Sequence, residues 1–491
     1  MEEADVVVVG SRLAGSAVAA PVARSGRKVI VIDKMTFPSD QLSTHLLTTT
    51  GVSELAKMGA LPRVLATNPT RVNQATFVCE GIPCSERFRP ADDGTDFGIC
   101  VPRDLQDICL VEATREQGAD IREGCVFDDL IWTNGRVAGI RYRDENGETR
   151  EVHATLTVGA DGRRSSVAAR VGAWTPYRMS KNGRGLVFRY MDDPKLGTKD
   201  AETFIVWREN KSMAFAFPSA PVGKLLVLFM GHRDEVSAAR KDPEGYWQAK
   251  LDQHPGMKER VAGVDSDSLT KVRSTGDTPA FFRASSGPGW ALAGDAGHFK
   301  DPVTGQGMRD AMWAGRTLAE WVIPQLDNPA SVDRATRQWE ADRDLHCLPA
   351  YHFANQDTKI EKQSAVLQEI FRDAGRTEDP DLGDLFTRHR TPQEIVPLPR
   401  MVRALTLALI RGKEPRGKIV SRSIGDLRTE LAIRREIRAG DFRSTRTVEG
   451  SDHTGVKWPA PPKAPPSESG MPPVPGAKKG RSEADSMEVS P

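Results

Sequence analysis

The stretch "DVVVVGSRLAGSAVAA", residues 5–20, constrains the fold of this chain more than any other. Its four consecutive valines are typical of a strand that is buried on both faces, as in a parallel sheet. The small residues that follow predict a helix packed closely on that strand. A second apolar run, "RKVIVIDK", predicts another buried strand that ends at Asp33. Residues 5–34 therefore predict a β-α-β unit.

The turn inside this unit carries Gly10 and Gly15 at the first and third positions of the pattern G-x-G-x-x-G, with Arg12 in place of the second glycine. Gly10 permits a tight turn, and Gly15 lets the helix approach the strand. The helix N-terminus attracts a pyrophosphate through its N–H groups and its dipole. Asp33 can accept a hydrogen bond from a ribose hydroxyl. Two interpretations of Arg12 stay open: an outward side chain, or a guanidinium that lies over the phosphates.

Two distant segments repeat the strand-turn-helix pattern. "TLTVGADGRRSSVAARVG" places Asp161 at the end of a strand. "GWALAGDAGHFKDPVTGQGMRDAM" places Gly294 and Asp295 at the end of another, followed by a loop with Pro302 and Gly305. Either segment alone is a common arrangement. Their order after the N-terminal turn is much more specific.

With these motifs the chain resembles the FAD-dependent aromatic hydroxylases, the single-component flavoprotein monooxygenases typified by para-hydroxybenzoate hydroxylase, over roughly residues 5–345. Geranylgeranyl reductases and flavin-dependent halogenases share the motifs. The resemblance implies an α/β fold: a Rossmann-like FAD-binding domain, an inserted mixed β-sheet substrate domain and a helical C-terminal region. The expected parts are the FAD-binding domain at 1–175 and 281–345, the substrate region at 176–280, the helical region at 346–455, and a Pro- and Ser-rich disordered tail at 456–491.

Carried over to this sequence, the resemblance implies a set of FAD-binding residues. The turn would hold the pyrophosphate, Asp33 the adenosine ribose and Asp295 the ribityl hydroxyls. Asp161 would link the FAD site to the region that faces NAD(P)H. A segment from Pro302 would lie beside the isoalloxazine ring, with the helix dipole aimed at the ring. The full set is Gly10, Arg12, Leu13, Ala14, Gly15, Asp33, Lys34, Arg103, Asp161, Gly294, Asp295, Pro302, Gly305, Gln306, Gly307 and Met308.

Met308 departs from the family pattern, in which asparagine is common at this position. No catalytic residue is assigned, and three candidates stay open. His298 and Lys300 are either solvent-facing loop residues or walls of the reaction pocket. His45, in "QLSTHLLTTTG", is a pocket or packing residue, a substrate contact, or a covalent flavin anchor.

The activity that the resemblance implies first is NAD(P)H-dependent monooxygenation. NADH or NADPH reduces FAD, and reduced FAD takes O2 to a C4a-hydroperoxide. That species hydroxylates a small aromatic or polyketide-like substrate beneath the second sheet. The alternatives are a reductase of isoprenoid double bonds, a halogenase, and a non-enzymatic binding or structural protein. The halogenase is disfavoured because "MAFAFPSAP" lacks the tryptophans of the W-x-W-x-I-P signature.

Composition excludes several other classes. Lys and Arg number 68 against 67 Asp and Glu, which argues against a nucleic-acid binder. The acidic N-terminus does not resemble a signal peptide, and no apolar run approaches the roughly 20 residues of a membrane span. The six scattered cysteines predict free thiols in a cytoplasmic protein, without a metal site. The stretch 394–411 predicts a helix that packs on the body or, with the arginines in 398–411, lies on a membrane surface. Nothing predicts the oligomeric state.

Overall fold

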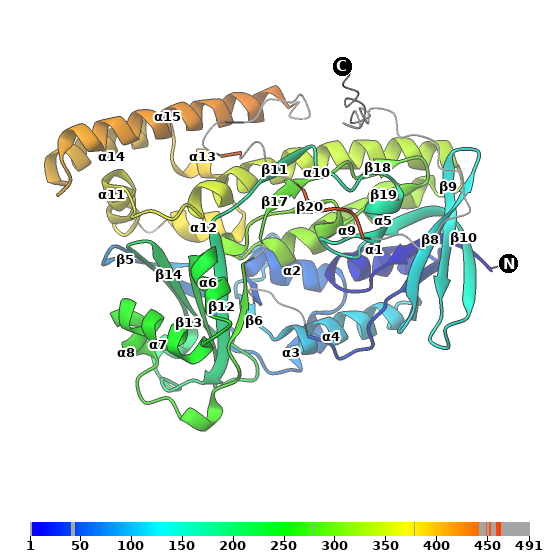
Figure 1. Ribbon diagram of the computed structural model, residues 1–491, viewed down its shortest axis with the longest axis horizontal. Helices are drawn as coiled ribbons and strands as arrows, with labels where there is room; N and C mark the ends of the chain where they lie inside the picture. The colour runs from blue at the N-terminus through cyan, green and yellow to red at the C-terminus, as the bar shows by residue number, and fades with distance from the viewer. Residues whose placement is uncertain are drawn as a thin grey trace, which may run out of the picture.

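The computed structural model describes residues 2–40, 45–276, 278–377, 379–440, 448, 451–452 and 458–462. The predicted disordered tail lies outside the described residues except at 458–462. Figure 1 shows two sheets at opposite ends of the molecule, with the C-terminal helices along one side. This arrangement confirms the predicted α/β fold with a second sheet and a helical C-terminal region.

The first sheet has the parallel strand order β19-β10-β1-β2-β7 at its centre. β1 (Glu2–Val9) lies between β10 (Thr149–Gly159) and β2 (Val29–Ile32), and the valines at 6–9 are buried as predicted. The flanking strands are β7 (Asp120–Arg122), β19 (Trp290–Leu292) and β18 (Ser286–Gly287), and β8 (Val126–Thr133) with β9 (Arg136–Arg143) extend β10 as an antiparallel hairpin.

The helices α1 (Leu13–Arg24) and α4 (Arg103–Glu116) pack against this sheet. A third helix, α9 (Gly307–Val322), packs on α1. α1 and α9 approach so closely that a Cβ on Gly315 would lie 2.5 Å from the Ala14 carbonyl oxygen. This close contact between helices explains why small residues follow the first strand.

The second sheet has the order β16-β12-β15-β14-β13-β4-β5. It is mixed, because β13 pairs in parallel with β4 and antiparallel with β14. The four strands β12 to β15 all belong to it and lie within the expected substrate region at 176–280. The pairing also adds two strands from the first 175 residues, so the domain boundaries stay a prediction. The bounds are β4 (Gln74–Cys79), β5 (Ile82–Arg87), β12 (Arg184–Asp192), β13 (Thr203–Glu209), β14 (Ser212–Pro218), β15 (Lys224–His232) and β16 (Arg273–Thr275).

The C-terminal region is helical, as predicted. Its helices are α10 (Pro329–Asp357), α11 (Ala365–Ala374), α12 (Asp381–Thr387), α13 (Pro392–Ile395), α14 (Leu398–Arg411) and α15 (Arg416–Ala439). Two small sheets, β11-β17-β20 and β3-β6, complete the strands. The remaining elements are α2 (Thr49–Lys57), α3 (Leu61–Leu65), α5 (Ser166–Arg170), α6 (Arg233–Ala238), α7 (Pro243–Gln253), α8 (Pro255–Arg260), β3 (Leu46–Leu47), β6 (Ile99–Cys100), β11 (Arg178–Ser180), β17 (Ala280–Phe282) and β20 (His298–Phe299). All six cysteines are free thiols, as predicted. None of the helices described is both long and apolar enough to cross a bilayer.

Candidate functional site

Four predicted cofactor segments meet at one edge of the first sheet. Gly10 follows β1, Asp33 follows β2, Asp161 follows β10 and Asp295 follows β19. Because these strands are parallel neighbours, their carboxyl ends lie side by side, where ligands bind in open α/β sheets. The turns are in close contact, since a Cβ on Gly10 would lie 2.5 Å from the carbonyl oxygen of Ala160. The fold therefore brings distant motifs into one site.

At two positions of the turn, Gly10 and Gly15, only glycine can be accommodated. Gly10 has a φ of +100°, which L side chains rarely adopt. A Cβ on Gly15 would lie 1.7 Å from the Gly10 carbonyl oxygen. α1 begins at Leu13, directly after this turn, so its N-terminus lies at the carboxyl edge of the sheet. This geometry fits a bound pyrophosphate.

Arg12 is held by neighbouring residues at the rim of the turn. Its guanidinium donates to the Ser39 hydroxyl at 2.6 Å, packs 5.2 Å from the ring centre of Phe37 and pairs with Asp107. Arg103 donates to the same carboxylate at 2.8 and 2.9 Å. The fully buried Asp107 thus joins both predicted arginines. Sequence reasoning missed Asp107, although its i,i+4 spacing from Arg103 was a usable signal.

The side chains of Asp33 and Asp161 accept hydrogen bonds from neighbouring loops of the site. Asp33 accepts hydrogen bonds from the Ser11 backbone at 2.8 Å and the Ser11 hydroxyl at 3.0 Å. Asp161 accepts from the Ser166 backbone at 2.6 Å and so lies at the start of α5. Lys34 is exposed beside Asp33. Asp33 keeps the position at the end of β2 that a ribose hydroxyl would need, and its cofactor role stays a prediction.

Asp295 is a half-buried carboxylate in the turn after β19. Burial raises the pKa of Asp295 to about 6, although Arg163 and Arg103 lower it. Gly294, with a φ of +57°, presses this turn against α1, since a Cβ there would lie 2.6 Å from the Ala14 Cβ. Ligand hydroxyls would supply hydrogen bonds that favour the ionised carboxylate. The residue therefore fits the ribityl chain of FAD.

FAD affinity is expected to depend on pH through Asp295. The raised pKa keeps this carboxyl protonated below pH 6, and hydroxyl donors favour the ionised form. The dissociation constant should therefore fall roughly tenfold between pH 5 and pH 7. Titrations that follow quenching of FAD fluorescence measure this change. An Asp295→Asn variant should bind FAD weakly with a flat profile, and a wild-type slope in that variant would refute the assignment.

The loop before α9 lies next to an unpartnered acceptor. Gly305 has a φ of +64° and ends a short 3₁₀ turn, after which α9 begins at Gly307. The Gln106 side-chain nitrogen lies 3.9 Å from the Met308 sulfur. The buried Gln106 Oε1 has no hydrogen-bond partner within the described ranges. A ligand donor at this loop would satisfy it, which fits a flavin beside residues 302–308.

His298 and Lys300 are buried, so the interpretation as solvent-facing loop residues is wrong. They expose 7% and 4% of their surface. His298 Nδ1 lies 3.0 Å from the Phe281 carbonyl oxygen, its ring stacks on Phe282, and burial lowers its pKa to about 3. Lys300 donates to Gln306 at 2.9 Å, and burial lowers its pKa to about 8. Neither lines the cavity described below, and Lys300 holds Gln306 in the loop before α9.

Asp310 is the carboxylate that balances this buried positive charge. It pairs with Lys300, with Arg309 at 3.1 Å and with Arg388 at 3.9 Å. Burial alone would raise the pKa of Asp310, and these cations hold it well below its usual range. Possible ligand atoms of His298 and Cys347 also lie within 4.8 Å of it. A metal ion there would meet three positive side chains, so the cluster does not fit a cation.

His45 packs against β12 of the second sheet. Its Nδ1 lies 2.5 Å from the Tyr190 hydroxyl, and its ring lies 5.3 Å from that of Phe188. Burial, assisted by the charge of Arg103, lowers the pKa of His45 to about 3. The imidazole is therefore neutral at physiological pH. These contacts support the packing interpretation, and the covalent anchor stays untested.

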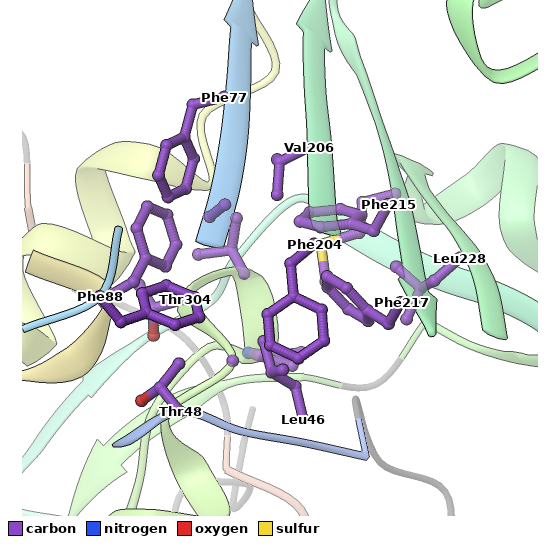
Figure 2. Close-up of a pocket in the computed structure, with 16 residues that line it drawn as sticks. Leu46, Thr48, Phe77, Phe88, Phe204, Val206, Phe215, Phe217, Leu228 and Thr304 are labelled. Carbon is purple, nitrogen blue, oxygen red and sulfur yellow. The ribbon is translucent and has the colours of Figure 1, made fainter. Parts of the chain in front are cut away.

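An apolar cavity lies between the second sheet and the loop of residues 302–306 that precedes α9. Figure 2 shows phenylalanine rings from several strands around it, with Thr48 and Thr304 at one end. The buried Thr304 hydroxyl lacks a hydrogen-bond partner in the described part of the chain. None of the described residues that line the cavity is charged. The lining is Leu46, Thr48, Ala75, Phe77, Phe88, Phe204, Val206, Phe215, Phe217, Leu228, Met230, Pro302, Val303, Thr304, Gly305 and Phe386.

Comparisons with known proteins agree with this geometry. A family model described as "FAD binding domain" matches residues 3–335. A digeranylgeranylglycerophospholipid reductase of Methanocella arvoryzae is 28% identical over 337 residues, which are 64% of this chain and 76% of the reductase. The squalene monooxygenase of Mus musculus is 27% identical over 356 residues, which are 68% of this chain and 58% of that enzyme.

Solved structures share the fold. The myxobacterial chondrochloren halogenase, an FAD-dependent enzyme, superposes with a TM-score of 0.64 and 21% identity. The match covers 84% of this chain and 97% of the halogenase. At this level of identity the likeness concerns the fold alone.

Proposed function

We propose, since the chain belongs to the FAD binding domain family, that it is an NAD(P)H-dependent monooxygenase that hydroxylates a small apolar substrate, either aromatic or polyketide-like. The family match covers 333 of the 491 residues, from 3 to 335, and includes all of the predicted cofactor segments. FAD, when bound, supplies hydride acceptance and oxygen activation. The residues of this chain bind and orient it and shield the substrate from water.

The observation that carries this proposal is the contact between the cavity and the loop of residues 302–306, called the flavin loop below because it is expected to hold the isoalloxazine ring. Pro302 and Gly305 belong both to the loop before α9 and to the cavity wall. A substrate in the cavity would therefore lie next to the segment that is expected to hold the isoalloxazine ring. The aromatic walls select apolar rings or chains and exclude water. The Thr304 hydroxyl would orient one polar group of the substrate.

A second candidate is a reductase of isoprenoid double bonds. A cavity lined without charge accepts a prenyl chain as readily as an aromatic ring. This activity would use the same flavin site without oxygen. It is supported by the likeness to a reductase of geranylgeranyl lipids, at 28% identity.

Oxygen consumption separates the two candidates. We expect purified protein with FAD and NADH or NADPH to take up oxygen when a suitable aromatic substrate is added, with one oxygen atom in the product. The measurement uses an oxygen electrode together with mass spectrometry of products formed under ¹⁸O2. Saturation of a prenyl chain with no label in the product would show the reductase instead. A colourless protein that does not take up FAD would refute both.

A Val206→Phe variant is expected to narrow the cavity without loss of FAD. Val206 lies in β13, and its side chain lines the cavity opposite the flavin loop. The larger side chain should raise KM for the preferred substrate by roughly tenfold, while absorbance of the bound flavin stays unchanged. Unchanged steady-state kinetics in a folded, yellow variant would show that the substrate binds elsewhere.

A further inference from the structure

The hairpin of α14 and α15, residues 398–440, combines exposed apolar side chains with a high positive charge. It holds eleven lysines and arginines against four acidic residues, a net charge of +7. The whole chain carries only +1, which leaves −6 for the rest. Six of the thirteen large hydrophobic side chains that are exposed in the described part of the chain lie on these two helices: Leu398, Val402, Ile410, Val420, Ile424 and Leu427.

Each helix buries one side and exposes the other. Ala408 of α14 and Ile419 of α15 pack with Ala365 of α11 in one cluster. On α14 the exposed residues Val402 and Ile410 are eight positions apart, which places them near one stripe of the helix. Figure 1 shows α15 along the outer edge of the molecule. The prediction of a helix packed on the body is thus correct for one side of α14, and the opposite side is exposed.

On α15 the exposed residues Val420, Ile424 and Leu427 follow the i, i+4, i+7 spacing of a single face. This helix has 24 residues and is therefore about 36 Å long. Exposed cations flank both apolar stripes. They are Arg403, Lys413, Arg416, Lys418, Arg428, Arg435 and Arg438.

Two of the arginines that suggested membrane contact from sequence bind the protein instead. Arg400 donates to Asp373 at 3.1 Å, and Arg411 lies 3.5 Å from Glu369. The third, Arg403, lies 3.7 Å from Asp373 and still keeps 69% of its side chain exposed. The charge available to a partner therefore comes mainly from α15 and the turn before it.

We propose that the exposed face of this hairpin docks on an anionic lipid bilayer. Apolar side chains of this kind enter the boundary between headgroups and acyl chains, and the cations pair with anionic headgroups. A second copy of the chain is disfavoured as the partner of this face, because two hairpins that each carry a net charge of +7 would repel each other. The segment 463–491 is also disfavoured, since its four basic and four acidic residues give it no net charge. This proposal goes beyond the flavin reaction and does not depend on it.

The test is flotation of the full-length protein with vesicles. We expect binding to phosphatidylcholine vesicles that contain about 30 mol% phosphatidylglycerol, and little binding to pure phosphatidylcholine. The variant Arg428→Glu/Arg435→Glu should lower the partition coefficient by about fivefold for each cation removed, thus at least ~25-fold in all. Val402→Ser/Ile424→Ser should lower it as well. Retained flavin absorbance and an unchanged thermal midpoint show that the variants fold.

Matched variants outside the hairpin serve as controls. Arg240→Glu/Lys241→Glu changes the same charge at an exposed turn, and Leu196→Ser removes an apolar side chain of similar exposure, 61%. Both should bind vesicles as the wild type does. Equal binding of wild type to neutral and anionic vesicles, no binding at all, or undiminished binding of the hairpin variants would overturn the proposal. So would a dimer that the apolar hairpin variant converts to monomer, since a second copy would then occupy the face.

Discussion

A Gly15→Ala variant is expected to purify without FAD. The added methyl group would lie 1.7 Å from the carbonyl oxygen of Gly10, and the nearest atom is backbone, which cannot rotate away. Either α1 moves off the strand or the turn changes shape, and both remove the N–H groups that face a pyrophosphate. We expect FAD affinity to fall at least ~100-fold, which is about 2.7 kcal/mol.

Absorbance of the purified protein and titration with FAD measure this loss. Gly425→Ala is the control, because a Cβ at Gly425 meets nothing within 4 Å. That residue lies inside α15, where alanine is favoured over glycine by about 1 kcal/mol. The control should keep its flavin and its stability. If Gly15→Ala were to bind FAD as wild type does, the turn would not be the pyrophosphate site.

The sequence was sufficient for features that depend on local pattern. The valine run and the small residues after it predicted the first sheet. The segments between 185 and 231 have the length and the β-forming residues of strands, and they indicated the second sheet. The carboxyl-end positions of Asp161 and Asp295 followed from two other segments, "TLTVG" and "WALAG", which lie at the ends of β10 and β19. Their convergence needed only the rule that parallel neighbours share an edge.

Features that depend on distant packing could not be predicted. β4 joins the second sheet by pairing with β13, more than a hundred residues away, and no local pattern encodes that choice. Lys300 looked like a loop residue and is buried because α9 and α12 close over it. Its counter-charge Asp310 and the nearby Arg388 come from these two regions. The i,i+4 spacing of Asp107 from Arg103 is visible in the sequence. Its second partner, Arg12, lies 95 residues away in the glycine turn, and no local pattern indicates that contact.

An Asp310→Asn variant is expected to be strongly destabilised, by about 3–5 kcal/mol. The substitution leaves Lys300, Arg309 and Arg388 close together without their shared carboxylate. Thermal unfolding monitored by circular dichroism at pH 7 measures the loss. The double variant Lys300→Met/Asp310→Asn should recover part of it, because one buried charge is then removed with its partner.

The pH dependence of this variant gives a second, independent check. The pKa of Lys300 is already lowered to about 8 by burial, against 10.5 for an ordinary lysine, so the folded protein binds fewer protons than the unfolded chain between these values. The contribution of Lys300 to the free energy of unfolding therefore rises as the pH increases from about 8 to 10.5. Without Asp310 the pKa of Lys300 falls further, and the rise begins at lower pH. The loss of unfolding free energy in Asp310→Asn, relative to wild type, should thus become smaller from pH 7 to pH 9. A deficit that stays constant over this range, or a double variant no more stable than the single one, would show that Lys300 and Asp310 do not compensate each other behind the flavin loop.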